Sequence, residues 1–301
     1  MAPVVLLSGG TGGAKLGRGL LDLCPELVVV ANTGDDVEAH GVHVSPDPDL
    51  VTYWLADRID ERGFGLRDDT FEVMSALEAA GRPVWFRLGD RDLAMCLIRT
   101  ELMRSGRSPT EAHAEVVAAM GVRARVLPMS DSPVRTEVVS GGRVIPLQEF
   151  MILERGAARI DEVRLNGIER AAPSEAVLEA LAAAEAILIG PSNPVISIGP
   201  ILALAGMRDA VAADAAPVVA VSPFVDGRAL KGPTEAFCEF AGIERSAAGV
   251  ARAYAGVIDG IVADEQVDGL PSLVCPTLMD DPAARRGVAE AVLAFARTLA
   301  S

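Results

Sequence analysis

The chain has 301 residues, half of them hydrophobic, and a formal net charge of −15. This provides enough apolar sequence for a large core. The net negative charge argues against nucleic acid or an anionic membrane surface as a partner, because both bind clustered Lys and Arg. The four scattered cysteines form no C-x-x-C pair, and no secretory signal or long uncharged stretch is visible, so we expect a cytoplasmic protein without disulfides.

The chain begins with an apolar strand at Val4–Leu7, a glycine-rich loop and a helix over Ala14–Leu23. Glycines let the backbone approach a ligand closely, and a helix N-terminus directs unpaired amides and positive charge toward an anion. We therefore expect this turn to bind phosphate through Gly10, Thr11, Gly12, Gly13 and Lys15. The spacing matches neither G-x-G-x-x-G nor G-x-x-x-x-G-K-[ST], and the alternative is a turn that only packs the strand against the helix.

Short β-branched runs alternate with helical patterns along much of the chain, which predicts an α/β fold with a doubly wound, mainly parallel Rossmann-like sheet. The further predicted sheet strands are Leu27–Ala31, Ala186–Ile189, Val218–Val221, Gly260–Val262 and Leu273–Cys275. The further predicted helices of this core are Glu175–Ala183, Ile201–Ala212 and Ala283–Thr298.

The middle of the chain has a different pattern. Four segments have helical apolar spacing: Leu50–Glu61, Asp69–Ala80, Asp92–Arg104 and Pro109–Met120. An alternating stretch, Val134–Val139, is joined by Ser140-Gly141-Gly142 to Arg143–Ile145, which predicts a hairpin. Arg159–Leu165 also alternates. We expect one Rossmann-like domain over residues 1–301, with an inserted helical lobe and a small antiparallel β element at about 50–170.

Acidic residues follow the second predicted strand, at Asp35, Asp36, Asp47 and Asp49. In an open parallel sheet, ligands bind at the carboxyl ends of the strands. Four carboxylates near a phosphate loop would repel an anion unless a divalent cation such as Mg²⁺ intervened. The alternative is that these aspartates form turns and helix caps, and one of Asp47 and Asp49 is expected to be only an N-cap.

Two further segments carry polar groups. Trp85–Asp92 combines aromatic, cationic and acidic side chains, which suits a planar or anionic ligand, although its arginines could simply pair with its aspartates. The loop from Gly190 to Pro200 is fixed by prolines and supplies donors from Ser192, Asn193 and Ser197 near a helix N-terminus. Such a rigid polar loop favours nucleotide recognition.

Together these segments resemble the CofD family, the 2-phospho-L-lactate transferases of coenzyme F-420 biosynthesis, called FbiA in actinobacteria. The resemblance covers nearly the whole chain. It rests on these segments: Ser8–Leu16, Asn32–Asp36, Ser45–Asp49, Arg87–Asp92, Leu127–Asp131, Gly190–Pro194, Ser197–Pro200, Val221–Pro223 and Lys231–Pro233.

The resemblance implies a transfer reaction. The ribityl hydroxyl of the deazaflavin Fo attacks the phosphorus that bears a three-carbon acid in a guanosine diphosphate ester, and GMP leaves. The product is coenzyme F-420-0, or its dehydro form when the donor carries enolpyruvate. The composition, rich in arginine and alanine, is similar to that of actinobacterial members, so we expect the enolpyruvyl donor over the lactyl one.

By matching position, the resemblance implies that Asp49 and Arg87 contact Fo and that Asp49 is catalytic. It also implies that Asp49 and Asp36 bind Mg²⁺. The glycine loop, Ser192, Asn193 and Ser197 would hold the nucleotide, and a homodimer is expected. Where this chain has Gly34-Asp35-Asp36, some members have Ala-Glu-Asp, which weakens a chemical role for Asp35.

A rival hypothesis is a regulatory protein similar to the YvcK-like factors, which bind nucleotide sugars without known catalysis. Those proteins share the N-terminal glycine loop but lack the Pro46–Asp49 and Ser192–Pro194 patterns. A nicotinamide-dependent oxidoreductase is a weaker alternative, because the dinucleotide fingerprint is imperfect and no acidic residue clearly ends the second strand.

Overall fold

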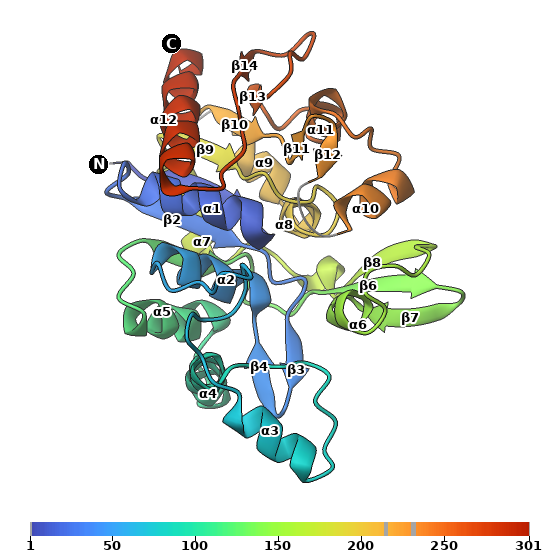
Figure 1. The fold of residues 1–301 in the computed structure, drawn as a ribbon. Helices are drawn as coiled ribbons and strands as arrows, with labels where there is room; N and C mark the ends of the chain where they lie inside the picture. Colours follow the sequence, from blue (N-terminus) through green and yellow to red (C-terminus); the bar gives the residue numbers. More distant parts are fainter. Residues whose placement is uncertain (1, 214–215, 230–232, 301) are drawn as a thin grey trace.

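A parallel sheet forms the centre of the molecule in this computed structural model (Figure 1). Every neighbouring pair of its seven strands is parallel. The order is β14 (Ser272–Val274), β13 (Gly260–Ala263), β10 (Val218–Val221), β9 (Ala186–Ile189), β1 (Val4–Ser8), β2 (Leu27–Ala31) and β5 (Arg125–Pro128). The α/β, doubly wound fold class predicted from the sequence is thus confirmed.

The sheet is buried on both faces, because alternate side chains of each strand enter different apolar cores. In β1, Val5 and Leu7 join one core while Val4 and Leu6 join the other. The first core is covered by α7 (Glu175–Ala182), α8 (Ile198–Ala203), α9 (Met207–Val211) and α11 (Ala247–Ala253). The second is covered chiefly by α1 (Gly10–Leu21), α2 (Pro46–Leu55) and α12 (Pro282–Leu299). This explains why the strands are apolar almost throughout.

Strand β5 was not predicted to belong to the central sheet. It pairs with β2 from Val28 opposite Arg125 to Ala31 opposite Pro128. The predicted insertion at about 50–170 is therefore interrupted, and the chain leaves the sheet twice, once before β5 and once after it. The single domain expected over residues 1–301 stays a prediction.

The first excursion is a helical lobe beside a short hairpin (Figure 1). The hairpin, which the sequence analysis missed, pairs β3 (Val37–Ala39) with β4 (Val42–Val44). Its turn places His40 and Gly41 at positive φ. The helices are α2, α3 (Glu72–Ala79), α4 (Asp90–Arg104) and α5 (Pro109–Ala119). The side chain of Ser108 caps α5 by accepting a hydrogen bond from the amide of Glu111.

The second excursion contains the predicted antiparallel element. Strand β6 (Arg135–Ser140) pairs with β7 (Arg143–Pro146) and with β8 (Glu162–Asn166).

The remaining elements of the described chain are α6 (Leu147–Ile152), a 3-10 turn at Ile168–Arg170, the two-residue strands β11 (Phe224–Val225) and β12 (Arg228–Ala229), and α10 (Thr234–Phe240).

The structure describes residues 2–213, 216–229 and 233–300. Lys231 and Gly232 of the Lys231–Pro233 motif lie outside these ranges. Within them, no helix combines the length and the apolar character needed to cross a bilayer. The four cysteines are free, three of them buried and Cys275 partly exposed.

Candidate functional site

A cavity of about 720 Å³ opens at the carboxyl ends of the central strands. It lies where the chain leaves β1 and β9, the two strands from which the sheet is extended in opposite directions. Ligands of open α/β sheets bind at this switch point, and the volume is within the usual range of ligand sites. Seven of the eight predicted nucleotide-binding residues line the cavity: Gly10, Thr11, Gly12, Lys15, Ser192, Asn193 and Ser197.

The two glycine-containing loops contact each other directly. A Cβ at Gly12 would overlap the carbonyl oxygen of Pro191, and one at Gly13 would overlap Ser8 Oγ. The amide of Gly9 donates a hydrogen bond to Ser192 Oγ at 3.4 Å. Only glycine permits this approach, which explains why Gly13 packs behind the cavity wall while Gly12 faces the cavity. The expectation that the two turns meet at one site is therefore confirmed.

The glycine loop is itself the first turn of α1, which begins at Gly10 rather than at Ala14 as predicted. Its N-cap residue, Gly9, has no side chain to cap it, its first turn carries no acidic residue, and Asp47 from α2 accepts from its first amide, that of Gly10. The first amides of a helix have no partners within it, so those that follow Gly10 are available to an anion. Lys15, one turn further on, forms an ion pair with the exposed Asp280 at 3.3 Å across the cavity wall.

Asn193 is held with its amide group ready to donate. Its Oδ1 accepts hydrogen bonds from the amides of Val195 and Ile196, at 2.8 and 3.2 Å. Its buried Nδ2 has no hydrogen-bond partner among the described residues, although the side chain lines the cavity. A buried donor without a partner is unfavourable, so this atom is suited to a ligand oxygen.

The carboxylates that line the cavity are Asp35, Asp47 and Asp280. Asp47 is in the first turn of α2 but does not cap its own helix. Its Oδ1 accepts from the amide of Gly10 at 2.6 Å, and its Oδ2 accepts from Asn32 Nδ2 at 2.9 Å. Asp35 Oδ2 accepts from Gln148 Nε2 at 3.0 Å. Asp47 thus accepts a hydrogen bond from the first backbone amide of α1, in the glycine-rich loop.

Burial makes the charged forms of Asp35 and Asp47 unfavourable. Burial, together with the charges of Asp47 and Asp36, raises the pKa of Asp35 well above its ordinary value. Burial also raises the pKa of Asp47 to about 6, against the opposing effect of the hydrogen bonds from Asn32 and Gly10. A cation bound between them would relieve this repulsion.

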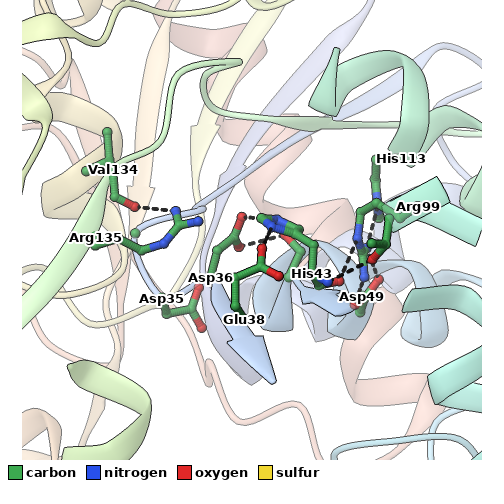
Figure 2. A network of polar contacts seen from close by, with 12 residues as sticks. Asp35, Asp36, Glu38, His43, Asp49, Arg99, His113, Val134 and Arg135 are labelled. Carbon is green, nitrogen blue, oxygen red and sulfur yellow. Dashed lines mark hydrogen bonds and ion pairs between the residues drawn. The ribbon is translucent and has the colours of Figure 1, made fainter. Parts of the chain in front are cut away.

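Asp36, one of the predicted metal ligands, does not line the cavity and points toward His43 of the β3–β4 hairpin (Figure 2). Its Oδ1 accepts from Ser45 Oγ at 2.7 Å, and its Oδ2 is 2.9 Å from His43 Nε2. Burial alone would lower the pKa of His43, but the hydrogen bond and charge of Asp36 outweigh it and raise that pKa. Both oxygens of Asp36 are therefore already bound.

Asp49, the predicted catalytic residue, lies in a second buried cluster (Figure 2). Its two oxygens accept one hydrogen bond each, both at 2.7 Å, from the guanidinium of Arg99 on α4, whose side chain is 2% exposed. Asp49 does not line the cavity. It is close to Asp92 and Cys96 in a group that could hold a metal ion, but Arg99 already supplies the positive charge there.

Arg87, the second predicted Fo contact, is exposed and does not line the cavity either. Its guanidinium forms an ion pair with Glu78 and lies 5.7 Å from the ring centroid of Phe71. The acceptor roles of Asp49 and Arg87, and the metal role of Asp36, stay predictions.

Some cavity residues carry no sequence signal. Gln148 and Met151 come from α6, which the sequence analysis did not identify, and Phe64 comes from the loop after α2. Thr277 has a buried Oγ1 without a partner among the described residues. None of these belongs to a motif, so only the folded chain brings them together.

The fold and this site define a Rossmann-like α/β protein with a glycine-rich helix N-terminus and two buried carboxylates at the switch point of its sheet. Residues 4–271 match the family described as 2-phospho-L-lactate transferase CofD. The chain therefore belongs to the CofD family, whose members are transferases of coenzyme F-420 biosynthesis, and it is a transferase.

Individual relatives agree with this assignment. The chain is 40% identical to the 2-phospho-L-lactate transferase of Methanosarcina mazei over 266 residues, which cover 87% of each chain. It is 38% identical to the phosphoenolpyruvate transferase of Streptomyces griseus, over 97% of this chain and 98% of that one. A crystal structure of a UPF0052 family member from Bacillus halodurans has the same fold, with a TM-score of 0.61, 19% identity, and coverage of 97% and 98%.

Proposed function

We propose that this protein transfers a phosphoenolpyruvyl or 2-phospho-L-lactyl group from a guanosine diphosphate ester to the ribityl hydroxyl of Fo. The hydroxyl oxygen forms a new bond to the phosphorus that carries the three-carbon acid. The bond from that phosphorus to the GMP oxygen breaks, and the hydroxyl proton is released. The products are GMP and coenzyme F-420-0, or its dehydro form.

The observation that carries this proposal is the convergence of both glycine-containing loops on one cavity. The N-terminus of α1 offers backbone amides to a diphosphate, and Asn193, which lines the same cavity, has a buried Nδ2 without a partner among the described residues. Displacement at phosphorus depends on positioning and charge neutralisation more than on a nucleophile from the protein. The cavity supplies both, and it needs no catalytic His or Cys.

We further propose that Asp35 and Asp47 hold the divalent cation, which we take to be Mg²⁺. The donor set fits a hard cation, because both groups are carboxylates in one cavity, where burial and the charge of Asp47 raise the pKa of Asp35. When bound, the cation would neutralise the diphosphate charge. This differs from the choice of Asp36 and Asp49 that the family resemblance implies, because neither of those side chains lines the cavity and Asp49 is already paired with the guanidinium of Arg99.

The chain's own groups then have distinct roles. Lys15 leaves Asp280 to bind a phosphate oxygen, because a diphosphate carries more charge than one exposed carboxylate. Asn193 donates to the nucleotide, and the hydrogen bonds from Asn32 and Gln148 orient the two carboxylates. We retain Asp49 and Arg87 as proposed acceptor contacts, and a cytoplasmic homodimer as the proposed assembly.

Mass spectrometry of the product from Fo and each of the two guanosine esters, with Mg²⁺, tests the proposal. We expect a product with the enolpyruvyl donor, and the lactyl product would be heavier by two hydrogens. Formation of neither product by folded protein that binds GDP would contradict transfer. That outcome would instead support the rival nucleotide-binding regulator.

A further inference from the structure

Phe64 is a large aromatic side chain that is exposed inside the candidate site. It is 60% exposed, the most exposed of the large hydrophobic residues among those described, yet it lines the cavity. Exposed aromatic surface is unfavourable in water. A single exposed apolar residue is nevertheless common on protein surfaces and would need no explanation elsewhere. Here the position beside a polar cavity is informative, because aromatic rings bind flat ligands by stacking.

The loop that carries Phe64 is well anchored. Ile59 and Leu66 form an antiparallel bridge and are both buried in a small apolar cluster between the loop and α2. Inside the loop, the amide of Asp60 donates to the carbonyl of Gly65 at 3.0 Å. Glycines at positive φ flank the ring, Gly63 at 86° and Gly65 at 68°. Phe64 is therefore presented from a fixed turn and not from an open strand of chain.

A half-exposed cation of the same loop, Arg62, lies against the ring. The guanidinium of Arg62 lies 5.0 Å from the centroid of Phe64 and 5.9 Å from that of Phe71. Asp60 fixes Arg62, because its Oδ1 accepts from the backbone amide and from Nε, at 3.0 and 2.6 Å. Arg87 lies on the ring of Phe71. The four side chains thus form a continuous row from the cavity to Arg87.

We infer that Phe64, supported by Arg62, is the stacking surface for the planar tricyclic ring of the acceptor, and so contributes to selection of an aromatic acceptor. The inference rests on the proposed function. The same row joins the ring to Arg87, a proposed acceptor contact that the family resemblance implies. Other apolar side chains of the cavity, Leu147 and Met151, would cover further parts of the ring system.

The test compares Phe64→Ala, Phe64→Trp and Leu97→Ala with the unaltered enzyme, in steady-state transfer and in calorimetric titration with Fo alone. Leu97 is 53% exposed on α4 and does not line the cavity, so it is a matched control. We expect Phe64→Ala to raise the Kd and KM for Fo roughly five- to tenfold, the effect of one aromatic stack. The KM for the donor and the Tm should be unchanged. Phe64→Trp should restore Fo binding.

Unchanged affinity for Fo in Phe64→Ala, or an equal loss in Leu97→Ala, would overturn the inference and leave the proposed function intact. A rise in the donor KM instead would assign the ring to the guanine base, which also overturns it. Failure of the proposed function gives a different result, since the unaltered enzyme would then neither bind Fo nor form product.

Discussion

The carboxylate of Asp49 is buried against the guanidinium of Arg99, and both side chains are almost inaccessible to solvent. The sequence pattern around it suggests chemistry, but in the fold its carboxylate is bound on both oxygens by Arg99. The pair joins the first turn of α2 to α4. Since Asp47 is in the same helical turn, this ion pair also holds the cavity carboxylate in position. Any test of catalysis by Asp49 must therefore separate a loss of chemistry from the loss of this ion pair.

Asp49→Ala should lower the free energy of unfolding by about 3–5 kcal/mol, because Arg99 would be left buried without a counter-charge. Urea denaturation of Asp49→Ala and of the double variant Asp49→Ala/Arg99→Met measures this. The double variant, which removes the buried charge, should recover part of the loss. A change below about 1 kcal/mol in the single variant would show that the ion pair contributes little to stability.

His113 on α5 extends the same cluster and should make stability depend on pH. Burial and the nearby Arg99 lower its pKa from 6.5 to about 4. Its Nδ1 accepts from Arg99 at 3.3 Å, so its Nε2 carries the proton and donates to Thr52 Oγ1 at 3.2 Å. A second proton would face the guanidinium, which is why the folded protein keeps this imidazole neutral.

The stability from a neutral His113 is fully present above pH 6.5 and is lost as the pH falls, because the unfolded chain takes up the proton first. Between pH 6.5 and 5 this amounts to about 2 kcal/mol. The difference in unfolding free energy between the unaltered protein and His113→Gln should shrink or reverse by that amount over this range. A difference that is independent of pH would contradict the assigned pKa.

At the scale of elements, the site depends on the close approach of α1 to the loop after β9. Gly12→Ala would push a methyl group against Pro191 and separate the two loops. Overpacking of this kind destabilises by about 1–3 kcal/mol, and we expect at least a tenfold loss of GDP affinity by calorimetry.

Gly287→Ala is the matched control for this variant. It lies in α12 with no atom within 4 Å of the added methyl, and it should be neutral or stabilising by up to about 1 kcal/mol. If Gly12→Ala bound GDP as tightly as the unaltered protein, the close contact between the loops would not be needed for nucleotide binding.

The predicted elements succeeded where burial controls the pattern. Leu27–Ala31, Ala186–Ile189 and Val218–Val221 are strands with the predicted bounds, because strands buried on both faces are apolar throughout. Local conformation was harder to predict. The single helix expected over Ile201–Ala212 is divided into α8 and α9, with Gly206 in the left-handed conformation between them.

At the scale of the whole molecule, the sequence predicts which loops meet but not how the acidic groups are distributed. Chain order along a parallel sheet places both glycine-containing loops at one edge, and the structure confirms this. The four aspartates after β2 look equivalent in sequence. Only tertiary contacts separate Asp35 and Asp47, which face the cavity, from Asp36 and Asp49, which bind His43 and Arg99.

We expect Asp35 and Asp47 to let a cation and a nucleotide diphosphate bind together in the crevice between the two loops. Electron paramagnetic resonance of Mn²⁺, used in place of Mg²⁺, measures this directly in the presence of GDP. The unaltered protein, Asp47→Asn and Asp49→Asn are compared after circular dichroism has confirmed their folding. Asp47→Asn should weaken Mn²⁺ binding at least about tenfold while Asp49→Asn retains it. Loss of Mn²⁺ binding in Asp49→Asn with full binding in Asp47→Asn would assign the cation to Asp49 and overturn the proposed site.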